Sequence, residues 1–257
     1  MNYHFESNYY SIFKPSIEIN RDYAHVGVHG IFYKTCNFNC VYCNNRSHPE
    51  ENYSYYSEQE FREIISKLLN KGCYFKFSGG EPTSNPNLFR DLQIVKDYGG
   101  IVLLDTNGSR PEIVQHLLEN KLIDTIGISL KGLNPESALK ISRINNSILC
   151  WDNVFKTIDM ASRVGIKVIV TLVFHDKMGY SDLNEFAHLL SEFPNVYLKV
   201  NNLLLNQNGL STYKPISDRA LISLIEDFVM SNSVWKSRIF LISNCSAVRD
   251  SEKIIYF

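Results

Sequence analysis

The stretch "IVLLDTNGSRPEIVQHLLENKLIDTIGISL" (101–130) carries the pattern that decides the fold. An apolar, β-branched run at 101–106 comes first, a helix-like segment follows at 110–120, and a second apolar run occupies 125–130. Short runs of this kind, joined through a helix, are typical of parallel strands that are buried on both faces. We therefore interpret 101–130 as a strand–helix–strand unit.

The same alternation continues on both sides of this unit. Further strands are expected at 25–35, 73–78, 166–174 and 196–200, and further helices at 57–70, 85–100, 151–165, 181–193 and 217–230. The helix at 57–70 opens with Ser57 and Glu60 at the spacing of a capping box. Alternating strands and helices predict right-handed βαβ units in one parallel sheet.

About six strands are too few for the eight of a closed TIM barrel. The predicted fold class is therefore α/β, a partial and open (β/α)6 barrel of the TIM type. No change in composition and no Gly/Ser-rich linker marks a second domain. We expect one domain over 1–257, with a core at about 25–205 and a C-terminal extension at about 206–257.

Composition and charge narrow the range of functions. The chain has 257 residues, of which 44% are apolar and 21% charged, as in an ordinary globular enzyme. Its 26 Lys and Arg residues nearly balance its 27 Asp and Glu residues, so nothing in the total charge indicates nucleic acid or an anionic membrane. The N-terminus lacks the pattern of a signal peptide, and no apolar run approaches a membrane span. We expect a cytoplasmic protein, and in that compartment clustered cysteines are more often metal ligands or redox groups than disulfides.

Three of the six cysteines are crowded into "TCNFNCVYCNN" (35–45). Cys36, Cys40 and Cys43 have the spacing C-x3-C-x2-C, with no fourth cysteine nearby. They are either small core residues, or ligands of a zinc ion with His48 as a fourth ligand, or ligands of an iron–sulfur cluster. Three thiolates on one short loop suit a [4Fe–4S] cluster in which one iron has no protein ligand.

Other polar motifs follow the predicted strands directly. They are Ser78 to Gly80, Asp105 to Asn107, and Ser129 to Lys131. Because loops beyond the carboxyl ends of parallel strands meet at one edge of the sheet, we expect these motifs and Cys36 to face one cleft.

With Tyr42 before its third cysteine, the C-x3-C-x2-C motif resembles that of the radical S-adenosylmethionine superfamily. The resemblance implies a radical enzyme of partial-barrel fold, in which the open iron binds the amino and carboxylate groups of S-adenosylmethionine. One electron then cleaves the adjacent C–S bond, giving methionine and a 5′-deoxyadenosyl radical that abstracts hydrogen. An electron donor such as flavodoxin or ferredoxin is implied as a partner, and Tyr42 is expected at the cofactor site.

Three further motifs extend this resemblance. "SGGEPT" (78–83) is similar to the family's GGEP motif, so Ser78, Gly79, Gly80 and Glu81 are expected to bind the methionyl amino group. Adjacent glycines would let main-chain carbonyls approach the ligand; the alternative is an ordinary turn. For Thr106 and Asn107 in "LDTNG" (104–108), the resemblance implies a place near the cofactor, although "TNG" is also a common turn.

The end of the next strand, "GISLKG" (127–132), resembles a further cofactor contact. Ser129 would touch the ribose and Lys131 would neutralise the cofactor carboxylate; the alternative for Lys131 is a solvated charge. No side chain is assigned a catalytic role beyond the cluster and the cofactor.

Within the superfamily, the motifs are most similar to the glycyl-radical enzyme activating enzymes, of which pyruvate formate-lyase activating enzyme is the named example. That similarity implies hydrogen abstraction from a protein or peptide. Three positions depart from it: Ser129 replaces an acidic residue, Thr171 an arginine and Asn206 a histidine. The alternative is a radical enzyme that modifies a small molecule or a nucleoside-type metabolite. A more remote one is a non-enzymatic zinc or iron–sulfur protein.

Overall fold

The computed structural model describes residues 3–6, 28–43, 53–70, 73–144, 147–193, 195–203, 212–243 and 253–257.

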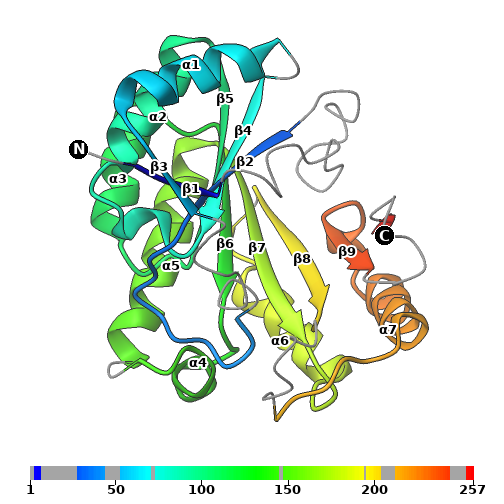
Figure 1. Ribbon diagram of the computed structural model, residues 1–257. Helices are drawn as coiled ribbons and strands as arrows, with labels where there is room; N and C mark the ends of the chain where they lie inside the picture. The colour runs from blue at the N-terminus through cyan, green and yellow to red at the C-terminus, as the bar shows by residue number, and fades with distance from the viewer. Residues whose placement is uncertain are drawn as a thin grey trace.

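An eight-stranded sheet runs through the described residues, and seven of its strands are parallel (Figure 1). In spatial order the parallel strands are β2 (Val28–Tyr33), β4 (Tyr74–Gly79), β5 (Ile101–Thr106), β6 (Thr125–Leu130), β7 (Lys167–Phe174), β8 (Val196–Asn202) and β9 (Ile239–Ser243). At one edge, β10 (Lys253–Tyr256) pairs antiparallel with β9. Each strand is added beside the previous one, so the carboxyl ends of the parallel strands share one edge of the sheet.

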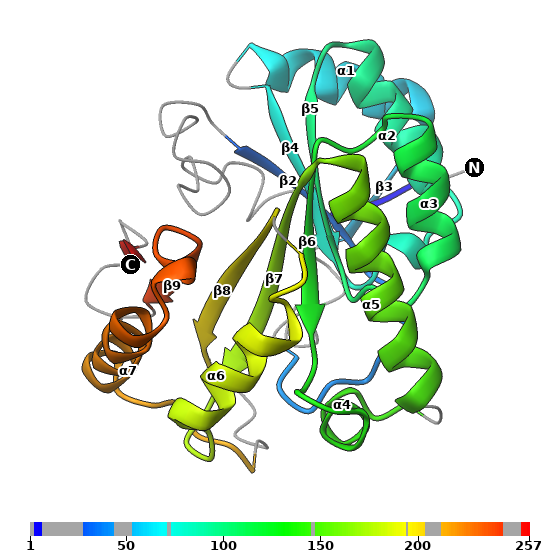
Figure 2. The ribbon, with the colours of Figure 1, turned by 180° about the vertical axis from the view of Figure 1, so that it is seen from behind.

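The helices form an outer layer, which Figures 1 and 2 show from opposite sides. They are α1 (Glu58–Leu69), α2 (Leu88–Asp97), α3 (Pro111–Glu119), α4 (Pro135–Ser142), α5 (Ser147–Val164), α6 (Tyr180–Leu189) and α7 (Asp218–Ser231), with short 3-10 helices η4 (Pro82–Ser84) and η5 (Ser233–Trp235). Neighbouring helices pack against each other: α1 on α2, α3 on α5, and α6 on α7. A separate antiparallel pair joins β1 (Tyr3–Glu6) to β3 (Tyr53–Tyr56).

The structure confirms the predicted fold class, a parallel α/β sheet that stays open. Each of the six expected strands is present within a few residues, and the capping box of Ser57 and Glu60 begins α1. The predicted number of strands was wrong, because β9 and β10 extend the sheet. Neither is followed by a helix within the described residues, so neither shows the strand–helix alternation that identified the others. Helix α4 was also missed; it has only eight residues, which are too few to show a clear helical period.

The two faces of the sheet differ in character. On β6, Ile126 and Ile128 are fully buried under the helices, whereas Thr125, Gly127 and Ser129 on the inner face are half-buried. A closed TIM barrel normally fills its interior with bulky apolar side chains. In this protein the inner face of the sheet carries polar side chains and is accessible, and the candidate site lies at this face.

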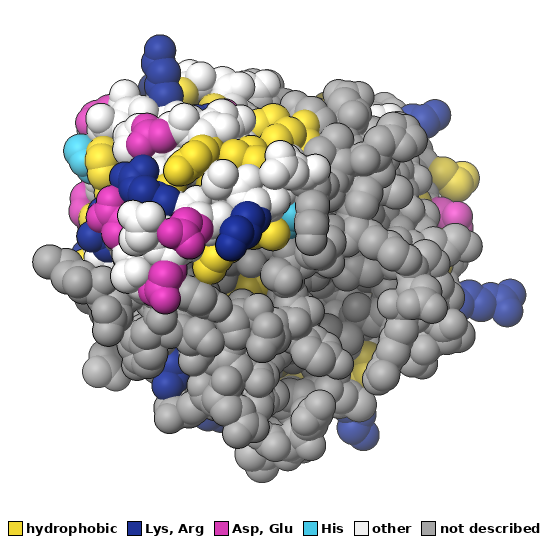
Figure 3. All heavy atoms as spheres, turned by 45° about the horizontal axis from the view of Figure 1, so that its top comes forward, with side chains coloured by type: hydrophobic (Ala, Val, Ile, Leu, Met, Phe, Trp, Pro, Cys, Tyr) yellow, Lys and Arg dark blue, Asp and Glu magenta, His cyan; other side chains and the backbone are white. Residues whose placement is uncertain are grey.

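The surface shows no patch of a single charge on the described part of the face seen in Figure 3. Lys and Arg side chains there lie among Asp and Glu side chains. On helix α1, for example, Arg62 pairs with Glu58 at 2.9 Å. Among the described helices, none has the length and apolar character needed to cross a membrane. The absence of a nucleic-acid partner stays a prediction.

Candidate functional site

A cavity of about 300 Å³ opens at the carboxyl ends of the central strands. The residues that line it are Cys36, Phe38, Cys40, Tyr42, Cys43, Ser78, Gly79, Gly80, Glu81, Asp105, Thr106, Asn107, Ser129, Lys131, Val173 and Asn201. All twelve residues expected from the sequence at the cluster and the cofactor are among them. Their convergence follows from topology, because parallel strands deliver their last residues to the same edge.

The cysteine loop is fixed by its backbone and its aromatic residues. The N–H groups of Asn39 and Val41 donate to carbonyls at the end of α4, both at 2.9 Å. Phe38 and Tyr42 are buried, at 8% and 7% exposure, so they anchor the loop in the core. Cys36, Cys40 and Cys43, which lie before, between and after these two anchors, line the cavity.

The chemistry of these donors fits an iron–sulfur cluster. Cys36 Sγ accepts a hydrogen bond from the N–H of Phe38 at 3.3 Å, a contact of the kind that tunes cluster sulfurs. Loss of hydration, with smaller contributions from the carboxylate of Glu81 and the two neighbouring thiols, raises the pKa of the Cys36 thiol to about 11, although the hydrogen bond from Phe38 lowers it. Deprotonation of this thiol therefore needs nearby positive charge, which bound iron supplies, with release of protons. His48, the alternative fourth zinc ligand, lies outside the described residues.

Tyr42 adds a neutral phenol to the cavity wall. Burial raises the pKa of Tyr42 far above its usual value, with the neighbouring Cys40 contributing. Its hydroxyl has no hydrogen-bond partner among the described residues, although it is buried. Such a group is costly to leave unsatisfied, so a ligand contact there would be stabilising.

Gly79 and Gly80 bring the end of β4 against the end of β2. The N–H of Gly80 donates to Tyr33 at 2.5 Å, and the N–H of Glu81 donates to Thr35 at 2.8 Å. A Cβ on either glycine would collide with backbone atoms of Tyr33 or Thr35, and Gly79 has φ +99°. From the sequence alone, these glycines are expected to let a ligand approach the main chain. In the structure they are required by the contact between two backbone segments, one of which leads into Cys36.

Glu81 ties β4 to β5 below the cavity. Its carboxylate accepts hydrogen bonds from Thr83 Oγ1, Thr106 Oγ1 and the N–H of Asn107, each at 2.6 Å, and from the N–H of Thr83 at 3.1 Å. Burial raises the pKa of Glu81 despite these bonds. Glu81 is only 1% exposed. Its carboxylate therefore makes its contacts inside the protein, where it holds Thr106 and Asn107 in position.

Asn107 connects β5 to the cysteine loop. Its Nδ2 donates to Asn37 Oδ1 at 2.8 Å, and Asn37 Nδ2 donates to Ser109 Oγ at 2.9 Å. Asn37 was not predicted, and its only signal in the sequence is its place between two cysteines. The network links the three segments that surround the cavity, so each constrains the position of the others.

Ser129 lies near the end of β6 and Lys131 directly follows this strand, and both line the cavity. Asp105, which the sequence placed at the cleft, also lines the cavity, together with Asn201 and with Phe38 and Val173, which the sequence did not single out. Asn201 Oδ1 is buried and has no hydrogen-bond partner among the described residues. The described lining of the cavity thus offers thiols, two carboxylates, amides, hydroxyls and one ammonium group, which suits a polar cofactor with both amino and carboxylate groups.

Comparison with known proteins agrees with this geometry. Residues 31–190 match the model of the Radical SAM superfamily. A putative glycyl-radical enzyme activating enzyme of Methanocaldococcus jannaschii is 26% identical over 171 residues, covering 63% of this chain and 68% of the relative. A probable GTP 3′,8-cyclase of Methanococcus maripaludis is 32% identical over 133 residues, covering 51% of this chain but only 43% of the relative.

A solved structure, Streptococcus suis SuiB bound to the precursor peptide SuiA, is similar in fold. Its TM-score is 0.67 at 18% identity, over 86% of this chain and 49% of SuiB. This chain therefore corresponds to about half the length of SuiB.

Proposed function

The chain belongs to the radical SAM superfamily, whose members use a [4Fe–4S] cluster and S-adenosylmethionine, and we propose that it abstracts hydrogen from a protein or peptide substrate. The observation that carries the proposal is the convergence of the cysteines and the three strand-end motifs on one cavity. When bound, the cluster and S-adenosylmethionine supply a 5′-deoxyadenosyl radical as the abstracting species. The protein supplies binding, orientation and exclusion of water.

The residues at the cavity have distinct roles in this proposal. Cys36, Cys40 and Cys43 hold the cluster. The backbone at Gly79 and Gly80, with Ser78 and Glu81, receives the amino group of the cofactor.

Thr106 and Asn107, which are fixed by Glu81, line the cofactor site together with Tyr42. Ser129 meets the ribose, and Lys131 neutralises the carboxylate. Because Thr106 and Asn107 are already held by hydrogen bonds to Glu81, they need little rearrangement to bind the cofactor.

Two similarities support a protein or peptide as the hydrogen donor. One relative is named as a glycyl-radical enzyme activating enzyme, and SuiB was solved with a precursor peptide. The half-open inner face of the sheet gives such a substrate access to the cavity. A low-potential donor such as flavodoxin or ferredoxin would deliver the electron, in the reducing cytoplasm.

A second candidate is a nucleotide or another small metabolite. It is favoured by the similarity to probable GTP 3′,8-cyclases, which reaches 32% identity. The two candidates differ in the origin of the abstracted hydrogen.

Deuterium transfer to 5′-deoxyadenosine tests the proposal. The reduced, reconstituted protein would be incubated with candidate partner proteins or peptides labelled at Cα, and the mass of 5′-deoxyadenosine measured. Label gained from a protein or peptide supports the proposal. Label gained only from a small metabolite, such as GTP, contradicts it in favour of the second candidate.

A further inference from the structure

We propose that Lys76 is a positioning residue for the cofactor, although it is not among the described residues that line the cofactor cavity. Lys76 holds the carboxylate of Asp105, and Asp105 in turn orients the hydroxyl of Ser78 toward the amino group of S-adenosylmethionine. This inference rests on the proposed function, in which Ser78 is part of the site for that amino group. It goes further by assigning roles to Lys76 and Asp105.

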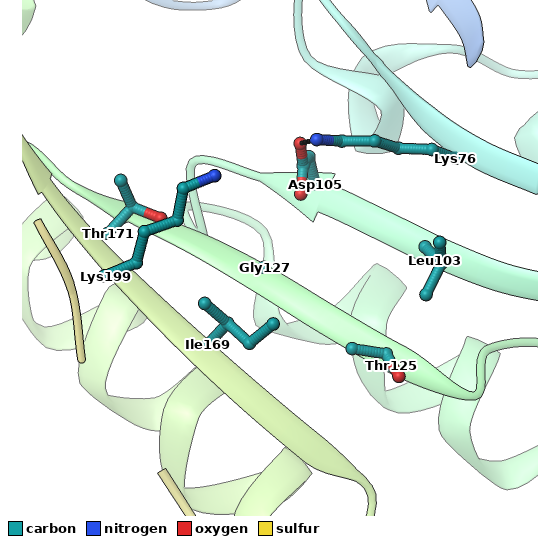
Figure 4. A pocket seen from close by; sticks show the side chains of 8 residues that line it. All are labelled: Lys76, Leu103, Asp105, Thr125, Gly127, Ile169, Thr171 and Lys199. Atoms are coloured by element: carbon teal, nitrogen blue, oxygen red, sulfur yellow. Dashed lines mark ion pairs between the residues drawn. The ribbon is translucent and has the colours of Figure 1, made fainter. Parts of the chain in front are cut away.

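Lys76 and Ser78 lie on the same face of β4. They are two residues apart and both are partly buried, whereas Phe75 and Phe77 beside them are fully buried. Because side chains alternate along a strand, Lys76 and Ser78 both point to the inner face of the sheet, where Ser78 reaches the cavity. Figure 4 shows the side chain of Lys76 running along this face from β4 to Asp105 on β5.

The carboxylate of Asp105 is held at both of its oxygens. Lys76 Nζ lies 2.9 Å from Oδ2, a distance typical of a charge-assisted hydrogen bond. Oδ1 lies against Gly127, the partner of Asp105 in register on β6, where an added Cβ would collide with this oxygen. The side chain of Lys76 is only 18% exposed, so water competes little for its ammonium group. Asp105 is thus fixed from both neighbouring strands.

Asp105 sets the direction of the Ser78 hydroxyl. Ser78 Oγ lies 3.3 Å from Asp105 Oδ2, the same oxygen that Lys76 contacts. An ionised carboxylate only accepts hydrogen bonds, so the hydroxyl must donate to it, and the lone pairs of Oγ are left to accept from an amino group. Because the contact is long for an O–H···O bond, a small movement of the carboxylate would break it.

The affinity for the cofactor should therefore depend on Lys76. Asp105 lines the cavity, and without the ammonium group of Lys76 its carboxylate can rotate. Ser78 then loses its fixed orientation and must be ordered when the cofactor binds. Groups that are already in place lose less freedom on binding, so removal of Lys76 should weaken the binding of S-adenosylmethionine.

Titration calorimetry of S-adenosylmethionine into the anaerobically reconstituted protein tests this role. Lys76→Met, which keeps the length of the side chain and removes its charge, should weaken binding about 10-fold, the lower end for loss of a hydrogen bond to a charged group. S-adenosylmethionine is a cation, so the loss of a positive charge from the protein would by itself tighten binding. Weaker binding therefore reports positioning and not overall charge.

Lys96→Met is the matched control. Lys96 on α2 pairs with Asp124 at 2.9 Å, and its side chain is 25% exposed, close to the values for Lys76. Asp124 directly precedes β6, so this ion pair lies at the amino end of the sheet, away from the cavity. Its loss should leave the affinity for S-adenosylmethionine unchanged.

The Ser78→Ala background shows whether Lys76 acts through Ser78. Ser78→Ala should itself weaken binding, and addition of Lys76→Met should cause little further loss, because the group that Lys76 positions is already gone. A role confined to the stability of the fold would give the same loss in both backgrounds. Asp105→Asn, which is nearly isosteric, breaks the ion pair from its other side and should show the same non-additivity, even where Lys76→Met fails to fold.

Equal or tighter binding by Lys76→Met, or a full additional loss in the Ser78→Ala background, would overturn the inference. Deuterium transfer from labelled protein or peptide, measured in the same samples, separates this result from the proposed function. A wild type that binds S-adenosylmethionine but takes no hydrogen from a protein or peptide refutes the proposed function and leaves the role of Lys76 in place. A wild type that does not bind S-adenosylmethionine refutes both.

Discussion

At the scale of single residues, Asp91 on α2 is a buried carboxyl below the cysteine loop. Its Oδ2 accepts a hydrogen bond from Tyr33 Oη at 2.7 Å, while Oδ1 has no partner among the described residues. Burial raises the pKa of Asp91 from 3.8 to about 7, more than the bond to Tyr33 and the charge of Arg90 lower it. Tyr33 is the last residue of β2, so this carboxyl supports the start of the cysteine loop.

The raised pKa makes stability depend on pH in a defined direction. Because the folded-state pKa is above the unfolded one, the contribution of Asp91 is fully present below about pH 4 and is lost as pH rises through about 7. Relative to Asp91→Asn, the wild type should therefore lose about 2 kcal/mol of unfolding free energy between pH 5 and pH 8. Urea denaturation of both proteins at the two pH values measures this difference.

Asp97→Asn is the matched control, since Asp97 is exposed on the same helix. It should show no such divergence from the wild type. If the stability of Asp91→Asn simply ran parallel to that of the wild type across this range, the raised pKa would be wrong.

At the scale of elements, the contact between β2 and β4 places the first cluster ligand. Gly80→Ala would press a Cβ into the backbone of Thr35, one residue before Cys36. We expect this variant to incorporate less iron than the wild type, and not merely to bind S-adenosylmethionine more weakly. Iron analysis after anaerobic reconstitution measures the effect.

Gly179→Ala controls for the substitution itself. A Cβ on Gly179, before α6, would meet nothing within 4 Å, so iron content should stay at the level of the wild type. Full iron incorporation by Gly80→Ala, with only cofactor affinity reduced, would instead support the earlier interpretation that the glycines make room for a ligand.

The strands and the residues at their carboxyl ends could be predicted from the sequence. Strands such as 101–106 are short apolar runs between helices, and both properties are visible in the sequence alone. Once the strands are placed, parallel topology brings Cys36, Gly80, Asn107 and Lys131 to one edge. The family motifs then indicate their chemistry.

The remaining features depend on contacts between strands, which the sequence does not display. Asn37 is important through its bond to Asn107, and the room that Gly127 leaves for Asp105 is a property of two neighbouring strands. The backbone contact that requires Gly80 has the same origin. The register of β2 against β4 decides what faces the glycine, and register cannot be read from composition or periodicity.

At the scale of the whole molecule, the open sheet divides the tasks between its two faces. The outer face packs against the helices and supplies the core, while the polar inner face and the strand ends form the cavity. An incomplete barrel leaves this face accessible to a substrate larger than the cavity. The proposed activity requires that the three cysteines at the cavity hold the cluster that activates S-adenosylmethionine.

Formation of 5′-deoxyadenosine by the anaerobically reconstituted, reduced protein tests that claim most directly. The wild type should contain about four irons per chain and form 5′-deoxyadenosine. Cys36→Ala, Cys40→Ala and Cys43→Ala should each abolish its formation. Cys73→Ala, which changes a half-buried cysteine outside the cavity, should leave it unchanged. Product formed at the wild-type rate by Cys40→Ala, or one tightly bound zinc in place of iron, would contradict the account.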